Sequence, residues 1–322
     1  ARSNTRGFAL GVALNAAFVV AELIAGTLAD SVALLADAAH NLGDVVGLLL
    51  AWGAALLAAR APTRTRTYGW RKSTILAALA NALLLIGATG ALAWEAIGRL
   101  ADPPPAAAPT MIVVAAIGVV INALAAWILL RSGHGHAHHG HDHHDHHDHP
   151  DHDHHDHAHA HHDHAPAPPD LNRRAAFVHM LADAGVSLGV VLTGALMLVS
   201  GWAWLDPALS LVIALVIVVG TWSLLRESLA LTLDAVPPSI ELEAVRDYLR
   251  ARPGVVGVHD LHVWALGSSE IALTAHLVLD RPPPPALLSE LEGGLHSRFG
   301  IAHTTLQVES PEQAPCRHPA GC

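Results

Sequence analysis

The sequence predicts a membrane α-helical protein, with six transmembrane helices followed by a small cytoplasmic α+β domain. Hydrophobic residues make up 52% of the 322 residues and charged residues only 14%, whereas soluble domains carry about 25% charged residues. The mean hydropathy is +0.38. Six apolar stretches are each long enough to cross a bilayer, which requires about 20 mostly apolar residues. The formal net charge of -10 treats all 26 histidines as neutral, so it gives no reason to expect a nucleic-acid partner, and we expect none.

The six apolar stretches are separated by short polar or proline-containing breaks. The predicted spans cover roughly residues 7–28, 32–59, 73–99, 110–130, 172–200 and 204–228. The first stretch is too long for the apolar region of a signal peptide, so we interpret it as a spanning helix in contact with membrane lipid. Basic residues cluster before the first span, in the loop 60–72 and around the loop between the fourth and fifth spans. Because loops rich in Lys and Arg face the cytoplasm, both termini and that latter loop are expected there.

Changes in composition divide the chain into five segments. We expect four spans in 1–132, a cytoplasmic loop in 133–169, two spans in 170–235, a small cytoplasmic domain in 236–310 and a Cys/His tail in 311–322. The loop holds 18 of the 26 histidines, interleaved with aspartates. With almost nothing apolar to bury, it is predicted to be disordered. It could capture metal weakly or be a tolerated flexible insert, and the candidate ligands include His134, His136, His138, His139, His141, His143 and His144.

The last segment has the pattern of a small folded domain. Residues 240–250 predict an amphipathic helix, and residues 287–299 predict a second helix. Alternation and β-branched residues predict strands over 255–265, 271–279 and 304–309. The resulting order αββαβ indicates a ferredoxin-like arrangement.

Two spans carry the same pair of ionisable residues at mid-span depth. His40 and Asp44 lie in the second span, and His179 and Asp183 lie in the fifth. A spacing of four places each pair on one helical face, one turn apart. One such pair is weak evidence, but two imidazoles and two carboxylates match the number and type of ligands of a tetrahedral Zn2+ site. Asp37, one turn before His40, could orient its imidazole or be a polar packing residue.

These motifs resemble those of the cation diffusion facilitator family, and the resemblance extends over nearly the whole chain. It is carried by the segments 35–44, 68–81, 179–185, 258–264 and 303–309. The resemblance implies a homodimeric exporter that exchanges Zn2+ for protons by alternating access. The His/Asp pairs imply the zinc-type branch. At Thr74 the family often has an acidic residue, and the loop 60–72 contains no His, Asp or Glu, so a loop metal site is not expected.

The resemblance also implies that the cytoplasmic domain, 236–310, binds metal and has a regulatory role. The implied ligands are His259, His276, His303 and Glu309, of which His276 and His303 could meet in space. His262 lies three residues after His259, and in a regular strand the two side chains would point to opposite faces. In the tail, Cys316 and Cys322 could complete a metal site across a dimer or belong to an unstructured end.

Metal binding requires neutral imidazole and ionised carboxylate, so Zn2+ and protons compete for such ligands. A reference pKa of about 6.5 makes histidine suited to this exchange. One alternative function is a membrane metal sensor or store, which would bind metal without moving it. A metalloenzyme is a weaker alternative, because catalytic zinc usually has three protein ligands and a nearby general base. We therefore expect a transporter and not an enzyme.

Overall fold

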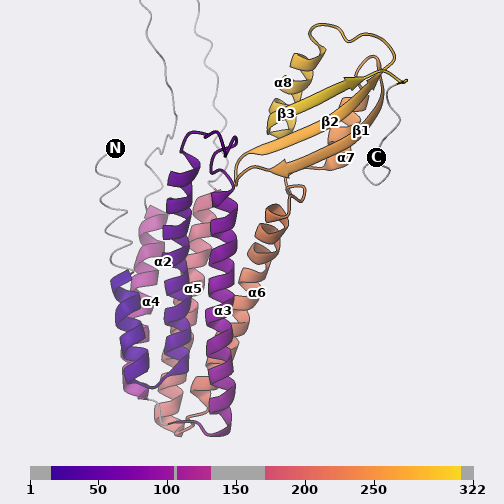
Figure 1. Cartoon of the computed structure of the whole chain (residues 1–322). Coiled ribbons are helices and arrows are strands. Elements are labelled where there is room, and N and C mark those ends of the chain that lie inside the picture. Colours follow the sequence, from indigo (N-terminus) through magenta and orange to yellow (C-terminus); the bar gives the residue numbers. More distant parts are fainter. Residues whose placement is uncertain (1–15, 105–106, 132–170, 313–322) are drawn as a thin grey trace, which may run out of the picture.

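Six helices form a bundle, and a small C-terminal domain lies beyond one end of it (Figure 1). The computed structural model describes residues 16–104, 107–131 and 171–312, and the side chains of residues 125, 128–131 and 171–179 lie outside this description. The helices are an N-terminal helix (Ala16–Leu28), α2 (Val32–Ala58), α3 (Ser73–Ala101), α4 (Ala108–Arg131), α5 (Leu171–Ser200) and α6 (Leu205–Thr232). The predicted start of the first span, residues 7–15, lies outside the described residues.

Length and hydropathy are sufficient to cross a membrane in α2, α3, α6 and the segment Met180–Ser200 of α5. The N-terminal helix and α4 are described over shorter apolar stretches, Ala16–Leu28 and Ala108–Leu124. The chain is therefore a multi-pass membrane protein, as the sequence predicts. Helix α6 continues four residues beyond its predicted end at 228. In that last turn, the Thr232 hydroxyl donates to the Ser228 carbonyl at 2.7 Å.

Small residues let the membrane helices approach closely. A Cβ atom added to Gly43 would lie 2.7 Å from a Leu85 methyl carbon, and one added to Gly47 would lie 2.8 Å from the Asn81 amide nitrogen. Helix α2 therefore packs directly on α3 through its glycine face. In addition, α4 packs on α5, and α3 packs on α6.

The beginning of α2 is held by a carboxylate from α6. Asp206 is buried and accepts hydrogen bonds from the backbone nitrogens of Val32 at 2.8 Å and Ala33 at 3.3 Å, and from the Ser31 hydroxyl at 2.5 Å. A carboxylate satisfies the free N–H groups at a helix start and complements the helix dipole. This contact joins residues 175 positions apart and was not anticipated from the sequence.

The C-terminal domain has the predicted element order αββαβ. It consists of α7 (Leu242–Arg250), β1 (Val255–Ala265), β2 (Ile271–Leu279), α8 (Leu287–Phe299) and β3 (Ile301–Glu309). The sheet order is β1-β2-β3, with β1 and β2 antiparallel and β2 and β3 parallel. The two helices bury one face of the sheet around a core that includes Leu249, Leu277, Leu291 and Leu295.

Two details of this sheet differ from the prediction. Strand β3 begins at Ile301 because Gly300, with φ of 69°, ends α8 directly, so His303 lies within the strand and not before it. In β1, an irregularity lies between His259 and His262, where Asp260 has φ of 47°. His259 pairs with His276 and His262 with Thr274. Since these partners are two residues apart, the two histidines share one face, and the expectation of opposite faces was wrong.

Candidate metal centres

The first candidate centre lies between α2 and α5 in the membrane bundle. His40 Nε2 lies 3.1 Å from Asp183 Oδ1, and one ligand atom each from His40, Asp44 and Asp183 lie within 4.8 Å of one another. Ligand bonds of about 2.0–2.2 Å place neighbouring donors of a tetrahedral zinc about 3.4 Å apart. The group therefore has the size of a metal site.

The helical spacing explains why these residues converge. His40 and Asp44 lie one turn apart on α2, and Asp183 faces them from α5. His179 lies one turn before Asp183 on α5, and its side chain lies outside the described residues. Thus three of the four predicted ligands come together in the structure.

Buried polar residues hold α2 against its neighbours around this centre. Asp37 is fully buried and accepts a 2.8 Å hydrogen bond from the Ser187 hydroxyl of α5. Asn41 donates a 3.1 Å hydrogen bond to Glu22 of the N-terminal helix, which is also fully buried. Buried carboxyl groups in a membrane are costly and mark functional regions. These two contacts lie on either side of His40 along α2, and they hold α2 against α5 and the N-terminal helix.

The second candidate centre lies on the sheet face that α7 and α8 leave uncovered. His259 Nε2 is 3.0 Å from Glu309 Oε2, and His276 Nδ1 is 3.0 Å from Glu309 Oε1. The two imidazole centroids are 5.0 Å apart. The strand register explains this cluster. His259 pairs with His276, and Glu309 pairs with Val278, two residues after His276 on β2. Two nitrogen donors and a carboxylate fit a zinc-type ion.

His303 lies outside this cluster, contrary to the prediction that it could meet His276. It pairs with Ala272, four positions from His276 along β2. Its Nε2 lies 2.7 Å from Arg71 Nη1, and its ring meets Tyr68 edge-on at 6.0 Å between centroids. His303 therefore belongs to a contact with the α2–α3 loop. The histidines of 133–164 and the two cysteines, Cys316 and Cys322, lie outside the described residues.

The α2–α3 loop docks on the C-terminal domain through contacts that the sequence analysis missed. Arg71 pairs with Glu270 of the β1–β2 turn, and Lys72 pairs with Asp234 after α6 at 2.6 Å. Thr74 accepts a 3.0 Å hydrogen bond from the backbone nitrogen of Ser268. Threonine at this position, where the resemblance suggested an acid, thus joins the two domains.

A multi-pass bundle with a His/Asp cluster, joined to a small domain with a second cluster of possible metal ligands, is the arrangement expected of a membrane protein that handles metal cations. Comparison with known families supports this class: the cation efflux transmembrane domain matches residues 9–231, and the cation efflux protein cytoplasmic domain matches residues 237–311. The chain belongs to the cation diffusion facilitator family of metal-cation efflux transporters.

Similar proteins come from several bacteria. The metal cation efflux system protein CzcD of Cupriavidus metallidurans is 35% identical over 97% of this chain and 88% of its own length. The zinc transporter ZitB of Escherichia coli is 32% identical over 98% of this chain and 90% of its own. A cadmium, cobalt and zinc/H(+)-K(+) antiporter of Bacillus subtilis is 29% identical over 91% and 85%. A solved structure, the metal-bound C-terminal domain of CzcD, is 42% identical over 22% of this chain and 99% of its own, with a TM-score of 0.21.

Proposed function

We propose that this metal-cation exporter carries Zn2+ in exchange for protons, through a site formed by His40, Asp44, His179 and Asp183. One observation carries the proposal: donor atoms of His40 and Asp44 on α2 and of Asp183 on α5 lie within 4.8 Å of one another. The two carboxylates of the full set balance the charge of one divalent cation. The buried hydrogen bond from Ser187 to Asp37 holds α5 against α2 beside these donors.

The donor types favour Zn2+ over harder cations. Imidazole suits Zn and its transition-metal neighbours, whereas Mg2+, Ca2+ and Mn2+ favour sites made of oxygen donors. A relative named a zinc transporter and another named for cadmium, cobalt and zinc are consistent with this preference. Zinc is thus the expected substrate, within a class of similar divalent ions.

Proton exchange follows from the same ligands. A protonated imidazole cannot bind metal and repels a cation, so a proton arriving from one side would displace the ion that came from the other. The ligands sit on two helices that pack on different partners, α2 on α3 and α5 on α4. A relative movement of these pairs would open the site to each side in turn. The basic loops favour a cytoplasmic location for both termini, and membership of a cation efflux family supports transport out of the cytoplasm.

Zinc flux into liposomes tests this function. The protein is reconstituted with a zinc-sensitive dye inside, and a pH gradient is imposed. Wild type is expected to give flux that depends on the gradient, whereas Asp183→Asn removes a ligand and should reduce flux to the level of empty liposomes. Asp102→Asn is the matched control, since Asp102 is exposed at the end of α3. Flux that survives in Asp183→Asn, or ignores the gradient, would contradict the proposal.

The sheet cluster of His259, His276 and Glu309 is proposed as a regulatory zinc site in a homodimer. The match to the family's cytoplasmic dimer domain supports pairing of two chains. Bound zinc would neutralise the carboxylate on the open sheet face and so favour the approach of a second copy. Weak metal capture near the entrance stays a prediction for the His-rich loop, and completion of a metal site across the dimer stays a prediction for the Cys316/Cys322 tail.

A further inference from the structure

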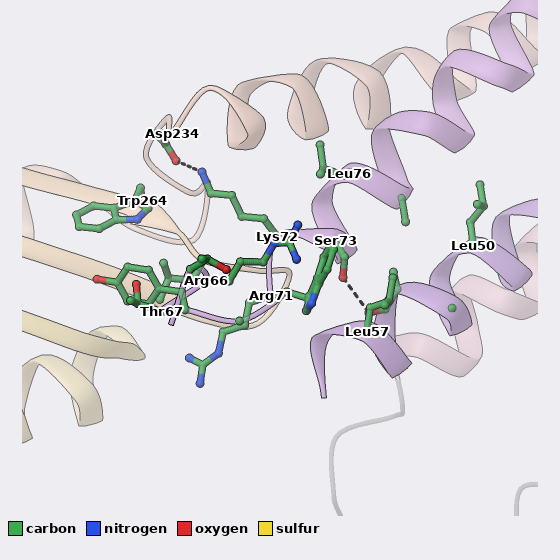
Figure 2. Close-up of a pocket in the computed structure, with 18 of the residues that line it drawn as sticks. Leu50, Leu57, Arg66, Thr67, Arg71, Lys72, Ser73, Leu76, Asp234 and Trp264 are labelled. Carbon is green, nitrogen blue, oxygen red and sulfur yellow. Dashed lines mark hydrogen bonds and ion pairs between the residues drawn. The ribbon is translucent and has the colours of Figure 1, made fainter. Parts of the chain in front are cut away.

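A cavity of about 950 Å3 lies where the membrane bundle meets the C-terminal domain. It has the size of binding sites for small ligands, which are about 300–1,000 Å3. Figure 2 shows Leu50, Leu57 and Leu76 from two helices on one side and Trp264 from a strand of the C-terminal domain on the other. Neither metal centre contributes a residue to its lining.

The wall formed by the helices is apolar and runs into the membrane. On α2, Leu49, Gly53 and Leu57 line the cavity, and Leu76 and Ala77 of α3 lie in the same lining. Leu49 lies nine residues before the end of α2 at Ala58, which is about 14 Å along a helix. One leaflet of the hydrocarbon core is about 15 Å deep. The wall therefore spans about the depth of an acyl chain in a single leaflet.

The rim of the cavity is positively charged. The loop 60–72 contains five basic residues and no acidic residue, and Arg66, Arg71 and Lys72 line the cavity. Glu270 pairs with Arg71 and Asp234 pairs with Lys72, which leaves the charge of Arg66 in excess at the rim. The Arg66 guanidinium lies 3.6 Å from the centre of the Trp70 ring, and it has no carboxylate partner among the described residues.

The geometry points to a binding site for an anionic phospholipid of the leaflet next to the C-terminal domain. Its phosphate would lie at Arg66 and Lys72, and one acyl chain would lie along Leu49, Leu57 and Leu76. Basic clusters beside a membrane span attract anionic lipids, and arginine binds phosphate through several donors. Since Trp264 and Leu266 close the other side, the lipid would contact both domains at their junction.

Two matched pairs of variants test the site in the full-length protein. After nanodiscs of equal phosphatidylcholine and phosphatidylglycerol are dissolved in detergent, native mass spectrometry counts the lipids that stay bound. Wild type is expected to retain phosphatidylglycerol in preference. Arg66→Gln should lower retained phosphatidylglycerol about tenfold, the loss typical of one charge-assisted hydrogen bond. Arg64→Gln removes the same charge from the same loop, outside the lining, and should change nothing.

The second pair tests the apolar wall without changing charge. A Cβ atom at Gly53 would meet nothing within 4 Å, so Gly53→Leu should fold, fill the groove and lower phosphatidylglycerol retention. Gly98→Leu is the control on α3, because a Cβ there also meets nothing within 4 Å and Gly98 is not in the lining.

Several results would overturn the assignment. Equal losses in Arg64→Gln and Arg66→Gln would mean diffuse attraction to a basic surface. Displacement of the lipid by millimolar inorganic phosphate would mean that the rim binds phosphate alone. Gly53→Leu could instead retain as much phosphatidylglycerol as wild type and lose the mass of the dimer. That result would mean that a second copy of the chain, and not a lipid, fills the cavity.

Discussion

The two metal centres differ in how their ligands are connected. In the membrane, His40 and Asp183 come from α2 and α5, two helices that are joined near the site by side-chain contacts such as Asp37 with Ser187. In the C-terminal domain, His259, His276 and Glu309 come from three strands whose backbones are hydrogen-bonded to one another. Helices can shift against each other by small slides of their side chains, whereas strands in register cannot.

This difference suits the two proposed roles. A transport site must lose its ion on one side of the membrane, so its ligands must be able to separate. A regulatory site must keep its geometry while it senses metal, and paired strands provide that. No described residue belongs to both sites, so a substitution at one site leaves the ligands of the other in place.

The largest expected effects come from removing one imidazole at each site. His40→Ala should lower zinc flux about 100-fold or more, since loss of even an outer partner of a metal ligand costs about 10–100-fold. It should leave zinc at the sheet site. His276→Ala should do the reverse: it should weaken zinc binding by the C-terminal domain and preserve flux at saturating zinc. Flux in liposomes and equilibrium zinc counting on the full-length protein measure both.

His262→Ala is the control for the sheet site, because His262 lies exposed on the same face outside the cluster. If His40→Ala emptied the sheet site, or His276→Ala abolished flux at saturating zinc, the two centres would not be independent.

A smaller effect is expected where α2 is anchored. Asp206→Asn weakens the contacts to Ser31, Val32 and Ala33 and should lower the free energy of unfolding by about 1–2 kcal/mol, as for loss of a helix cap. Thermal unfolding in detergent measures this loss. Flux should fall, because α2 carries two transport ligands, while zinc at the sheet site stays unchanged. Asp102→Asn provides the same chemical change at an exposed position; equal destabilisation by both would refute the anchoring role.

The smallest effect is expected at the junction of the domains. Glu270→Gln removes the acidic partner of Arg71, an ion pair with both side chains about one-third exposed, and such pairs contribute about 0–1 kcal/mol. Hydrogen exchange of residues 66–74 should become faster, with both metal centres intact. Glu290→Gln on α8, an exposed residue without an ion pair among the described residues, should leave exchange unchanged. Unchanged exchange in Glu270→Gln would mean that Thr74 and Lys72 hold the junction without it.

The membrane bundle, the order αββαβ and the closeness of His40 and Asp44 on α2 could all be predicted from the amino-acid sequence. These features follow from local rules: apolar length, alternation, and a spacing of four that places His40 and Asp44 on one face. The resemblance between motifs then indicated the family, which the comparisons confirm.

Contacts between residues far apart in the chain could not be predicted in this way. Asp206 accepts a hydrogen bond from Ser31, 175 positions away, at the start of α2. His303 contacts Arg71 rather than His276. An irregularity in β1 places His262 on the same sheet face as His259. The physical reason is that side-chain spacing along one element is set by the geometry of its own backbone. Contacts between elements depend instead on the register and packing of the whole chain, which a local pattern does not contain.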